Sequence, residues 1–508
     1  MVSLKKNNIK TWIKKNIILL GTSILLLIVM HLPFLQSDPD AFVDVNTRGA
    51  WTDEGLYSSQ IINYINTGEF NIEENNQMVI SPLFTALLYP FYLIFGTNVL
   101  VGRLVVLFFI SFSLFICFKK KELQYAGLIV IPVLMTQYQV FHFSHYNMPE
   151  MVCVGWILLA FASANNYFLQ KKKYLFFIFL SSFFLFCAYS TKIQFLTSAL
   201  VLPVSLFFYA FNQENKKKTK LLIRFKPFFI SLIFTVLFFV IYIAFWYLSN
   251  KSFYDKVWSY ETAGRFPVSF IHLWQLIKFH FNFTLWVKEL KPLFIFSALG
   301  VLLSFFVFLD KDGRKYSGSL LFLFFWSIAE FTKISASYLP YRYLLGFIMS
   351  FSLFGILSLA HFFKKSIFFK YLIIVASAIV CCYNIGLIYK SYHNRTYQIK
   401  AVNSYLKQFN LENKTILGTW SHTLARNTKA KCITVKRGYL NDNNFIFKYN
   451  PVLVISENNE ADSDSVFLKN GIILNNISDS SRQFTVWRYK INLYWINQTF
   501  KNDYLRKF

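Results

Sequence analysis

Runs of about 20 apolar residues recur along the chain, and short clusters of lysine and arginine separate them. A run of this length crosses the hydrocarbon core of a bilayer as one α-helix. The composition agrees, because 55% of the 508 residues are hydrophobic, 20% are aromatic and only 15% are charged. A soluble protein carries about 25% charged residues. The sequence therefore predicts an α-helical polytopic membrane protein and excludes both a soluble domain and a barrel.

The apolar runs define about eleven candidate membrane spans. They are residues 16–36, 99–118, 124–141, 148–169, 174–190, 193–211, 227–249, 291–309, 317–334, 340–362 and 371–389.

The basic clusters fall between these spans on alternate connections. They are residues 5–15, 119–121, 171–173, 216–226 and 311–315, followed by Lys364, Lys365 and Lys370. By the positive-inside rule this face is cytoplasmic. The net charge of +27 thus encodes topology and gives no reason to expect a nucleic-acid partner. An odd number of spans places the N-terminus inside and the C-terminal segment outside, which predicts a multi-pass protein of the cell inner (plasma) membrane.

The first external loop, residues 37–98, has one basic residue, Arg48, against eight acidic ones. Residues 53–67 are expected to form a helix lying in the membrane interface, with Ile61 and Ile62 on its apolar side. Residues 79–95 are apolar but broken by Pro82 and Pro90, so we expect a second, partly embedded piece there.

The composition changes after residue 390, which divides the chain into a membrane module, 1–390, and a C-terminal domain, 391–508. Four strand-like runs, "KTILGT", "KCITVK", "PVLVIS" and "QFTVWRYK", are separated by turns rich in Asn, Asp and Ser. This pattern predicts a small extracytoplasmic α/β domain. It contains no recognisable catalytic constellation.

Several familiar catalytic motifs are missing from the sequence. No phosphate-binding P-loop, no GxGxxG after a strand and no CxxC metal spacing occurs. Asp38-Pro39-Asp40 has the spacing of the DxD that holds a metal and a nucleotide sugar, but on the external side we interpret it as a loop at a helix end. His145 and His280 are lone histidines, which are more often hydrogen-bonded structural residues than metal ligands.

Two adjacent carboxylates, Asp53 and Glu54, stand in the first external loop beside the membrane. Carboxylates are favoured at a helix start by the helix dipole, which is a sufficient structural reason for such a pair. A cleft that excludes water can also raise a carboxylate pKa, and a base poised in this way takes a proton from a hydroxyl nucleophile.

The stretch "WTDEGLYSSQIINYINTGEF", with the "SPLFTALLYPFYLIFGTNVLVGRL" that follows it, resembles the first external loop and second span of GT-C glycosyltransferases. More narrowly, it resembles the bacterial branch of family 39, grouped with protein O-mannosyltransferases and the lipid A aminoarabinose transferase. The matching positions are Asp53-Glu54, Ser81-Pro82, Phe95-Gly96 and Arg103. Weaker similarity lies in "HYNMPEM", "AYSTKIQFL" and "YLPYRYLL", which contain Glu150, Lys192 and Arg342.

The resemblance implies an inverting enzyme of GT-C type that moves a sugar from a polyprenyl-phosphate donor to a hydroxyl of a lipid, glycan or protein outside the cytoplasm. Asp53 is then the expected general base. Glu54 and Glu150 orient hydroxyls or hold a divalent metal ion, which spacing alone does not establish. Lys192 and Arg342 are the first candidates to bind the leaving phosphate, followed by Arg265 and by Arg103, for which a structural pair with an acidic residue of the loop is the alternative.

Two other functions remain open at this level. A secondary transporter or lipid or polysaccharide flippase is the alternative, although such proteins tend to carry ionisable residues near midmembrane and repeated halves. A structural or assembly subunit is the third. Neither the sugar nor the acceptor is identified by the sequence.

Overall fold

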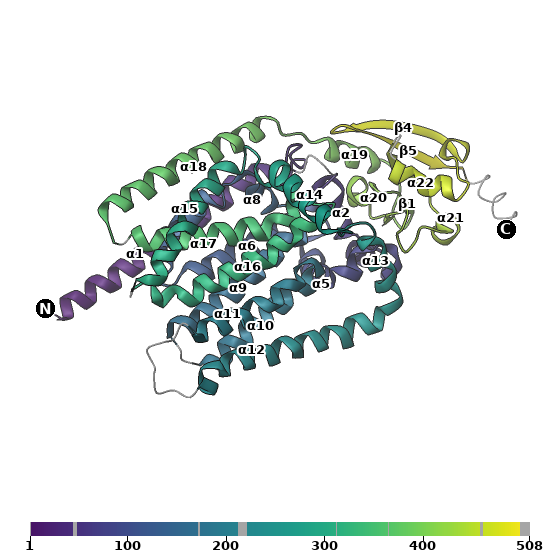
Figure 1. Cartoon of the computed structure of the whole chain (residues 1–508). Coiled ribbons are helices and arrows are strands. Elements are labelled where there is room, and N and C mark those ends of the chain that lie inside the picture. Colours follow the sequence, from purple (N-terminus) through teal and green to yellow (C-terminus); the bar gives the residue numbers. More distant parts are fainter. Residues whose placement is uncertain are drawn as a thin grey trace.

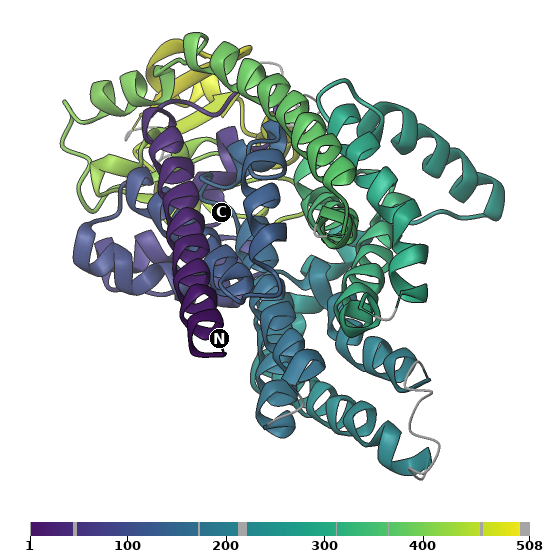
Figure 2. The same ribbon diagram turned by 90° about the vertical axis from the view of Figure 1, so that its left-hand side faces the viewer.

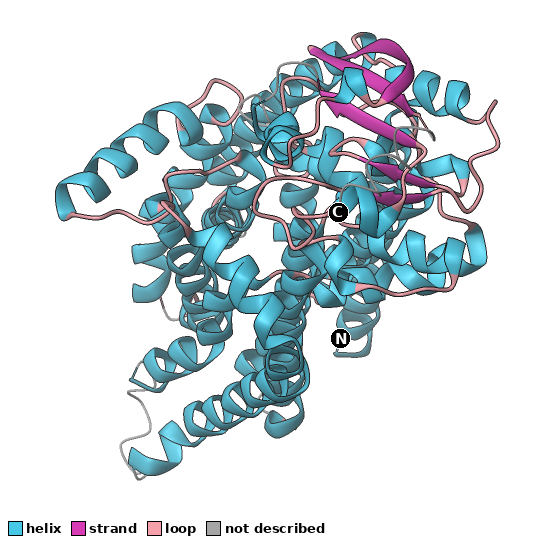
Figure 3. Cartoon of the chain, turned by 90° about the vertical axis from the view of Figure 1, so that its right-hand side faces the viewer, coloured by secondary structure: helices cyan, strands magenta, loops and turns pink. Residues whose placement is uncertain are grey.

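The computed structural model describes residues 2–43, 48–170, 173–211, 221–310, 312–363, 365–457 and 461–497. Parts of the predicted basic clusters, residues 171–172, 216–220, 311 and 364, lie outside these ranges, as does the chain after residue 497. Long helices run side by side through most of the molecule, and a small sheet stands at one end of them (Figure 1). Figure 3 shows the strands gathered in one corner of an otherwise helical chain.

Within the described residues, ten helical segments are long and apolar enough to cross a membrane. Their main helices are α1 (Val2–His31), α6 (Val99–Phe118), α9 (Pro149–Gln170), α10 (Tyr174–Thr191), α11 (Val201–Phe211), α12 (Leu221–Tyr242), α15 (Lys291–Leu309), α16 (Ser317–Phe331), α17 (Leu345–Phe363) and α18 (Ile367–His393).

Two of these helices, α9 and α17, are much more buried than the others, so they form the centre of the bundle. Helix α1 lies at the front in Figure 2, and α12 lies at the edge of the bundle in Figure 1. Many side chains of α12 and α18 are exposed aliphatic or aromatic groups, as expected for helices that face lipid.

One predicted span differs from the structure. Residues 124–141 are two short helices, α7 (Gln124–Val133) and α8 (Tyr138–Phe143). Pro132 lies in the last turn of α7, where it cannot donate a backbone hydrogen bond. The side chain of Gln137 accepts a hydrogen bond from the amide of Val140 (3.0 Å) and thereby caps α8. The apolar run is long enough for a span, but its local chemistry ends one helix and starts another.

The first external loop also differs from the expectation. Residues 53–67 belong to two helices, α2 (Ala50–Leu56) and α3 (Ser59–Thr67), and most of their side chains are buried within protein. Ile61 and Ile62 pack into the main hydrophobic core. The prediction of one helix in the membrane interface is therefore wrong. After η2 (Ile72–Glu74) and α4 (Gln77–Ile80), the predicted apolar piece is α5 (Pro82–Phe95).

Lysines from three of the basic clusters lie together at one end of the bundle. Lys121, Lys315, Lys365 and Lys370 border one cavity. Helix α6 runs about 30 Å from Asn98, beside the C-terminal domain, to Lys119. These described lysines and the C-terminal domain thus stand at opposite ends, as the charge pattern predicts.

The C-terminal domain is built on a five-stranded sheet of order β2-β1-β3-β5-β4. The strands are β1 (Thr415–Leu417), β2 (Lys431–Ile433), β3 (Leu453–Glu457), β4 (Ser478–Val486) and β5 (Tyr489–Ile496). The first three are parallel, and β5 is antiparallel to both β3 and β4. Its helices are α19 (Gln398–Leu406), α20 (Ser421–Leu424), α21 (Phe445–Tyr449) and α22 (Ala461–Lys469). Two separate apolar cores, one containing residues of α19 and α20 and the other those of α21 and α22, give the predicted α/β domain.

The domain is attached to the first loop by close packing. Trp51 of α2 is buried in the core beside α20, and its ring stacks on Trp487 with centroids 5.6 Å apart. A Cβ on Gly55 would come within 2.6 Å of Thr423 Oγ1, so only glycine lets α2 approach α20 this closely. The C-terminal domain therefore holds the helix that carries Asp53.

Candidate active site

A cavity of about 600 Å³ lies where the first loop, the segment after α12 and the C-terminal domain meet. Its charged lining residues are Arg48, Asp53, Glu261, Arg265, Arg342 and Lys436. Six tyrosines also line it, namely Tyr57, Tyr260, Tyr338, Tyr343, Tyr439 and Tyr489. Polar groups and aromatic faces of this kind suit a sugar, which offers hydroxyls on its rim and C–H groups on its face.

Asp53 and Arg342 face each other on the wall of this cavity. The distance between Asp53 Oδ2 and Arg342 Nη2 is 3.0 Å, and the Asp53 side chain is 16% exposed. Asp53 lies in the first turn of α2, while Arg342 lies in the short helix η9 (Tyr341–Leu344) that leads into α17. Pro340 precedes η9 in an extended conformation and sets the direction in which the segment enters.

A second ion pair lies behind the first and is fully buried. Lys192 Nζ is 2.6 Å from Glu150 Oε1, and both side chains are 1% exposed. Glu150 lies in the first turn of α9, where the helix dipole favours a carboxylate, and Lys192 follows the last residue of α10, where it favours a cation. Arg342 Nε is 3.6 Å from the same Glu150 oxygen. The charges thus alternate in a continuous row, which compensates their burial.

Tyr57 separates Lys192 from the cavity. Lys192 Nζ donates a 2.6 Å hydrogen bond to the Tyr57 hydroxyl and lies 4.8 Å from the ring centroids of both Tyr57 and Tyr343. Burial, followed by the nearby Glu150 carboxylate, raises the pKa of Tyr57 well above its ordinary value. The phenol therefore stays neutral. Lys192 belongs to the row of charges but not to the cavity wall.

Arg265 does lie on the cavity wall. Its guanidinium is 2.6 Å from Glu261 and stacks over the ring of Tyr338 at 5.6 Å. The backbone of Ser337 donates to the Arg265 carbonyl (2.9 Å), which fixes this loop against the segment before η9. Of the four predicted phosphate-binding cations, Arg342 and Arg265 therefore border the cavity.

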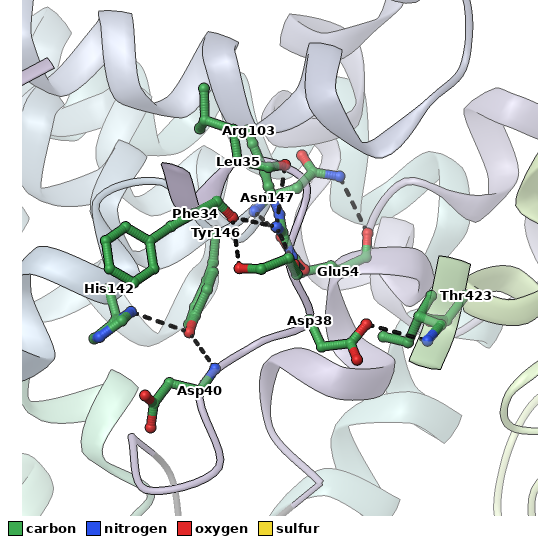
Figure 4. Close-up of polar contacts among 12 residues, drawn as sticks. Phe34, Leu35, Asp38, Asp40, Glu54, Arg103, His142, Tyr146, Asn147 and Thr423 are labelled. Carbon is green, nitrogen blue, oxygen red and sulfur yellow. Dashed lines mark hydrogen bonds and ion pairs between the residues drawn. The ribbon is translucent and has the colours of Figure 1, made fainter. Parts of the chain in front are cut away.

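Glu54 and Arg103 form a separate pair away from the cavity wall (Figure 4). Arg103 Nε donates to Glu54 Oε1 at 2.8 Å, its Nη2 donates to the other oxygen, and the amide of Asn147 also donates to Oε1 (2.7 Å). The remaining nitrogen of Arg103 donates to three backbone carbonyls after α1, those of Phe34, Leu35 and Ser37. This is the structural pairing given above as the alternative for Arg103.

The Asp38-Pro39-Asp40 motif is occupied by bonds within the protein. Asp38 accepts hydrogen bonds from Thr396 Oγ1 (2.7 Å) and from the amides of Gln398 (2.6 Å) and Ile399 (3.1 Å). Asp40 accepts from the hydroxyls of Tyr138 and Ser391, and its amide donates to Tyr146 (Figure 4). Both aspartates thus join the first loop to the region where α18 ends and α19 begins.

The two lone histidines also have structural partners. His145 Nδ1 lies 2.9 Å from Nδ1 of His31, and burial lowers the pKa of His145 well below its ordinary value. His280 Nε2 donates to the carbonyl of Ala336 (2.7 Å). Among the residues that the structure describes, no three His, Cys, Asp or Glu side chains are grouped so as to hold a metal ion.

A second cavity, of about 250 Å³, borders Glu54 and Arg103. Two other basic residues line it, Lys400 and Arg426, and Arg426 donates to the Thr97 carbonyl (2.7 Å) and to Tyr92 (2.6 Å). Because Glu54, Arg103 and Arg426 already bond to protein, this cavity is less suited to chemistry than the larger one.

Sequence reasoning missed several residues of the cavity. Tyr57 stands four positions after Asp53, directly after the last residue of α2, a helical spacing that would have revealed it. Lys436 and Tyr439 come from the loop after β2, and no local pattern marks them. Burial, followed by the carboxylates of Glu261 and Asp53, raises the pKa of Tyr439 well above its ordinary value.

Comparison with known proteins gives structural relatives only. No protein-family model matches the chain, and no curated protein sequence matches it. The structure is similar to ArnT from Cupriavidus metallidurans bound to undecaprenyl phosphate, with 12% identity, a TM-score of 0.58 and coverage of 94% of this chain and 97% of that one. Its apo state gives 13% identity, a TM-score of 0.59 and the same coverage.

The archaeal oligosaccharyltransferase AglB from Archaeoglobus fulgidus, in complex with an inhibitory peptide and a dolichol-phosphate, is also similar. It shows 12% identity and a TM-score of 0.51, over 88% of this chain and 69% of that one. At such low identity the likeness shows a shared fold, which covers the membrane helices and extends into the C-terminal domain.

Proposed function

We propose that this chain, which has the GT-C membrane fold, is a glycosyltransferase that uses a sugar linked to a polyprenyl phosphate. The observation that carries the proposal is the Asp53–Arg342 pair on the wall of a polar, tyrosine-rich cavity. Further support comes from the relatives, since ArnT was solved with undecaprenyl phosphate and AglB with a dolichol-phosphate.

The pair supplies the two functions that such a transfer requires. Asp53 accepts the proton of an acceptor hydroxyl, whose oxygen attacks the anomeric carbon. The bond between that carbon and the phosphate oxygen breaks, and the lipid phosphate leaves with the electron pair. Attack opposite the leaving group inverts the anomeric centre. Arg342 and Arg265 stabilise the phosphate charge as it develops.

The residues behind the cavity keep these groups in place. Glu150 lies between Lys192 and Arg342 and balances the charge of both cations. Lys192 acts on the leaving phosphate through this row and through Tyr57. Glu54 and Arg103 fix α2, and with it Asp53, against α6.

The acceptor is a hydroxyl of a lipid, a glycan or a protein. The cavity stands at the end of the bundle opposite the lysine clusters, so the reaction takes place on the non-cytoplasmic side of the cell membrane. In this arrangement the donor is delivered from the outer leaflet, where its phosphate lies near the ends of α10 and α17.

The test is a transfer assay with the full-length protein in membranes, with radiolabelled polyprenyl-phosphate sugars supplied as donors. The unmodified protein is expected to transfer label, whereas Asp53→Asn and Arg342→Ala are expected to lose transfer. Asp255→Asn is the matched control, because it makes the same carboxylate-to-amide change at an exposed position of α13 (Lys251–Thr262). No transfer by the unmodified protein from any such donor would refute the proposal.

A further inference from the structure

Another buried ion pair, Glu330–Lys333, has no place in the chemistry of the candidate site. Glu330 is in the last turn of α16, and Lys333 is in η8 (Thr332–Ser335), the short helix that follows. Lys333 Nζ is 2.6 Å from Glu330 Oε2, and the side chains are 12% and 0% exposed. Burying two charges is costly and is no guarantee of stability, so such a pair calls for a specific role.

The lysine end of the pair contacts the segment that follows Lys192. Lys333 Nζ lies 3.7 Å from the ring centroid of Phe195. The amide of Phe195 in turn donates to the carbonyl of Lys192 (2.9 Å), at the start of η3 (Ile193–Leu200). A desolvated cation held over an aromatic face is a favourable contact. Lys333 therefore fixes the turn through which the chain leaves Lys192.

The glutamate end of the pair contacts the segment that follows Arg342. Gly346 stands one helical turn after Arg342, at the beginning of α17. A Cβ on Gly346 would come within 2.1 Å of Glu330 Oε2. The carboxylate therefore packs directly on the backbone of α17, and any larger residue at position 346 would displace it.

The Glu330–Lys333 pair thus touches both the segment that follows Lys192 and the segment that follows Arg342. Lys192 and Arg342 come from different helices, and both contact Glu150 and the ring of Tyr343. The Glu150–Lys192 pair and the Glu330–Lys333 pair also share a neighbour. Both pairs lie within electrostatic range of the Cys153 thiol on α9.

We propose that Glu330 and Lys333 are positioning residues that set the spacing between Lys192 and Arg342, and thereby the affinity of the site for a polyprenyl phosphate. The inference rests on the proposed function. A displacement of about 1 Å in a positioning group can change a rate by about 100-fold, so a modest shift of this pair is measurable.

The sharpest probe is Gly346→Ala, which adds one methyl group against Glu330 and leaves every charge in place. Gly386→Ala is its matched control, since Gly386 also lies within a membrane helix, α18, and a Cβ there meets nothing within 4 Å. The charge variants are Glu330→Gln, Lys333→Met and the double variant, which removes both charges together.

The experiment measures the affinity of the purified full-length protein in nanodiscs for undecaprenyl phosphate without a sugar, together with its melting temperature. In the transfer assay, the KM values for donor and acceptor are measured separately. We expect Gly346→Ala and the double variant to bind the lipid phosphate about tenfold more weakly and to raise the donor KM, with the acceptor KM unchanged. Gly386→Ala should match the unmodified protein.

The stability readout separates positioning from simple support of the fold. Each single charge variant leaves a buried partner uncompensated and should melt at a lower temperature than the double variant. A double variant that regains normal lipid affinity together with normal stability would overturn the proposal. Normal affinity in Gly346→Ala would also overturn it. If the unmodified protein binds no polyprenyl phosphate, the proposed function fails and this inference fails with it.

Discussion

At the scale of single residues, the two neighbouring carboxylates of the first loop have different partners. Asp53 faces Arg342 on the cavity wall, whereas Glu54 is held by Arg103 beneath α2. The reason is helical geometry, because consecutive side chains of a helix point about 100° apart. Asp53 thus lines the cavity, whereas Glu54 belongs to the scaffold, the buried pairing with Arg103 that supports α2.

The cavity residue should affect the reaction more than the fold. We expect Asp53→Asn to lower kcat by about 10² to 10⁴-fold, because the amide cannot accept the acceptor proton. Donor binding should change little, since Arg342 and Arg265 remain. Steady-state kinetics in proteoliposomes measures both parameters, and a wild-type kcat in Asp53→Asn would exclude this role.

The scaffold residue should behave in the opposite way. Glu54→Gln leaves the buried Arg103 guanidinium uncompensated, which costs about 3–5 kcal/mol in comparable buried pairs. We expect a clear fall in melting temperature and in the yield of folded protein, measured in detergent. An unchanged melting temperature together with lost activity would instead place Glu54 in the chemistry.

Some of these assignments were accessible from the sequence and others were not. Asp53 stands out through its family-like motif, and Arg342 because a cation at the external end of a span runs against the charge rule. Lys436 and Tyr439 enter the cavity only through tertiary folding, because the C-terminal domain packs on α13 and on the first loop. Phe195, Glu330 and Gly346 likewise acquire a role only once three helices have met.

At the scale of elements, hydropathy predicts the long helices well and the short ones poorly. A run of about 20 apolar residues has one physical solution in a bilayer. Residues 124–141 are shared by two helices because Pro132 and Gln137 provide local end signals that hydropathy does not register. The run "QFTVWRYK" reads as a single strand, yet Trp487 adopts a left-handed conformation (φ 53°) and turns the chain between β4 and β5.

The first loop also caps a helix of the C-terminal domain. Asp38 accepts from the first two amides of α19, which have no partner within the helix. Asp38→Ala should therefore destabilise the protein by about 1–2 kcal/mol. Thermal unfolding followed by circular dichroism checks this value, with Asp255→Ala as an exposed control. Equal melting temperatures would mean that the cap contributes nothing to the fold.

At the scale of the whole molecule, the membrane helices and the C-terminal domain are one structural unit around the cavity. His422 of α20 is buried near this junction, and burial, aided by Arg426, lowers its pKa to about 3. A lowered pKa in the folded state means that stability is complete above the ordinary value of about 6.5 and is lost as the pH falls towards about 3.

Acid should therefore weaken the junction in a way that depends on His422. At pH 5 the loss from this one group is about 2 kcal/mol. Between pH 7.5 and pH 5, we expect the melting temperature of the unmodified protein to fall further than that of His422→Gln. Differential scanning fluorimetry of both proteins measures the difference. Equal losses would show that His422 does not control the effect.

The stacking of Trp51 on Trp487 has a consequence for biosynthesis. The first loop leaves the ribosome soon after α1, while the β4–β5 hairpin that receives Trp51 is made only after α18. A nascent chain that stalls before the hairpin keeps an uncovered indole and an unfinished cavity. Premature release thus yields an inert product with an exposed aromatic surface, of the kind that cellular quality control recognises.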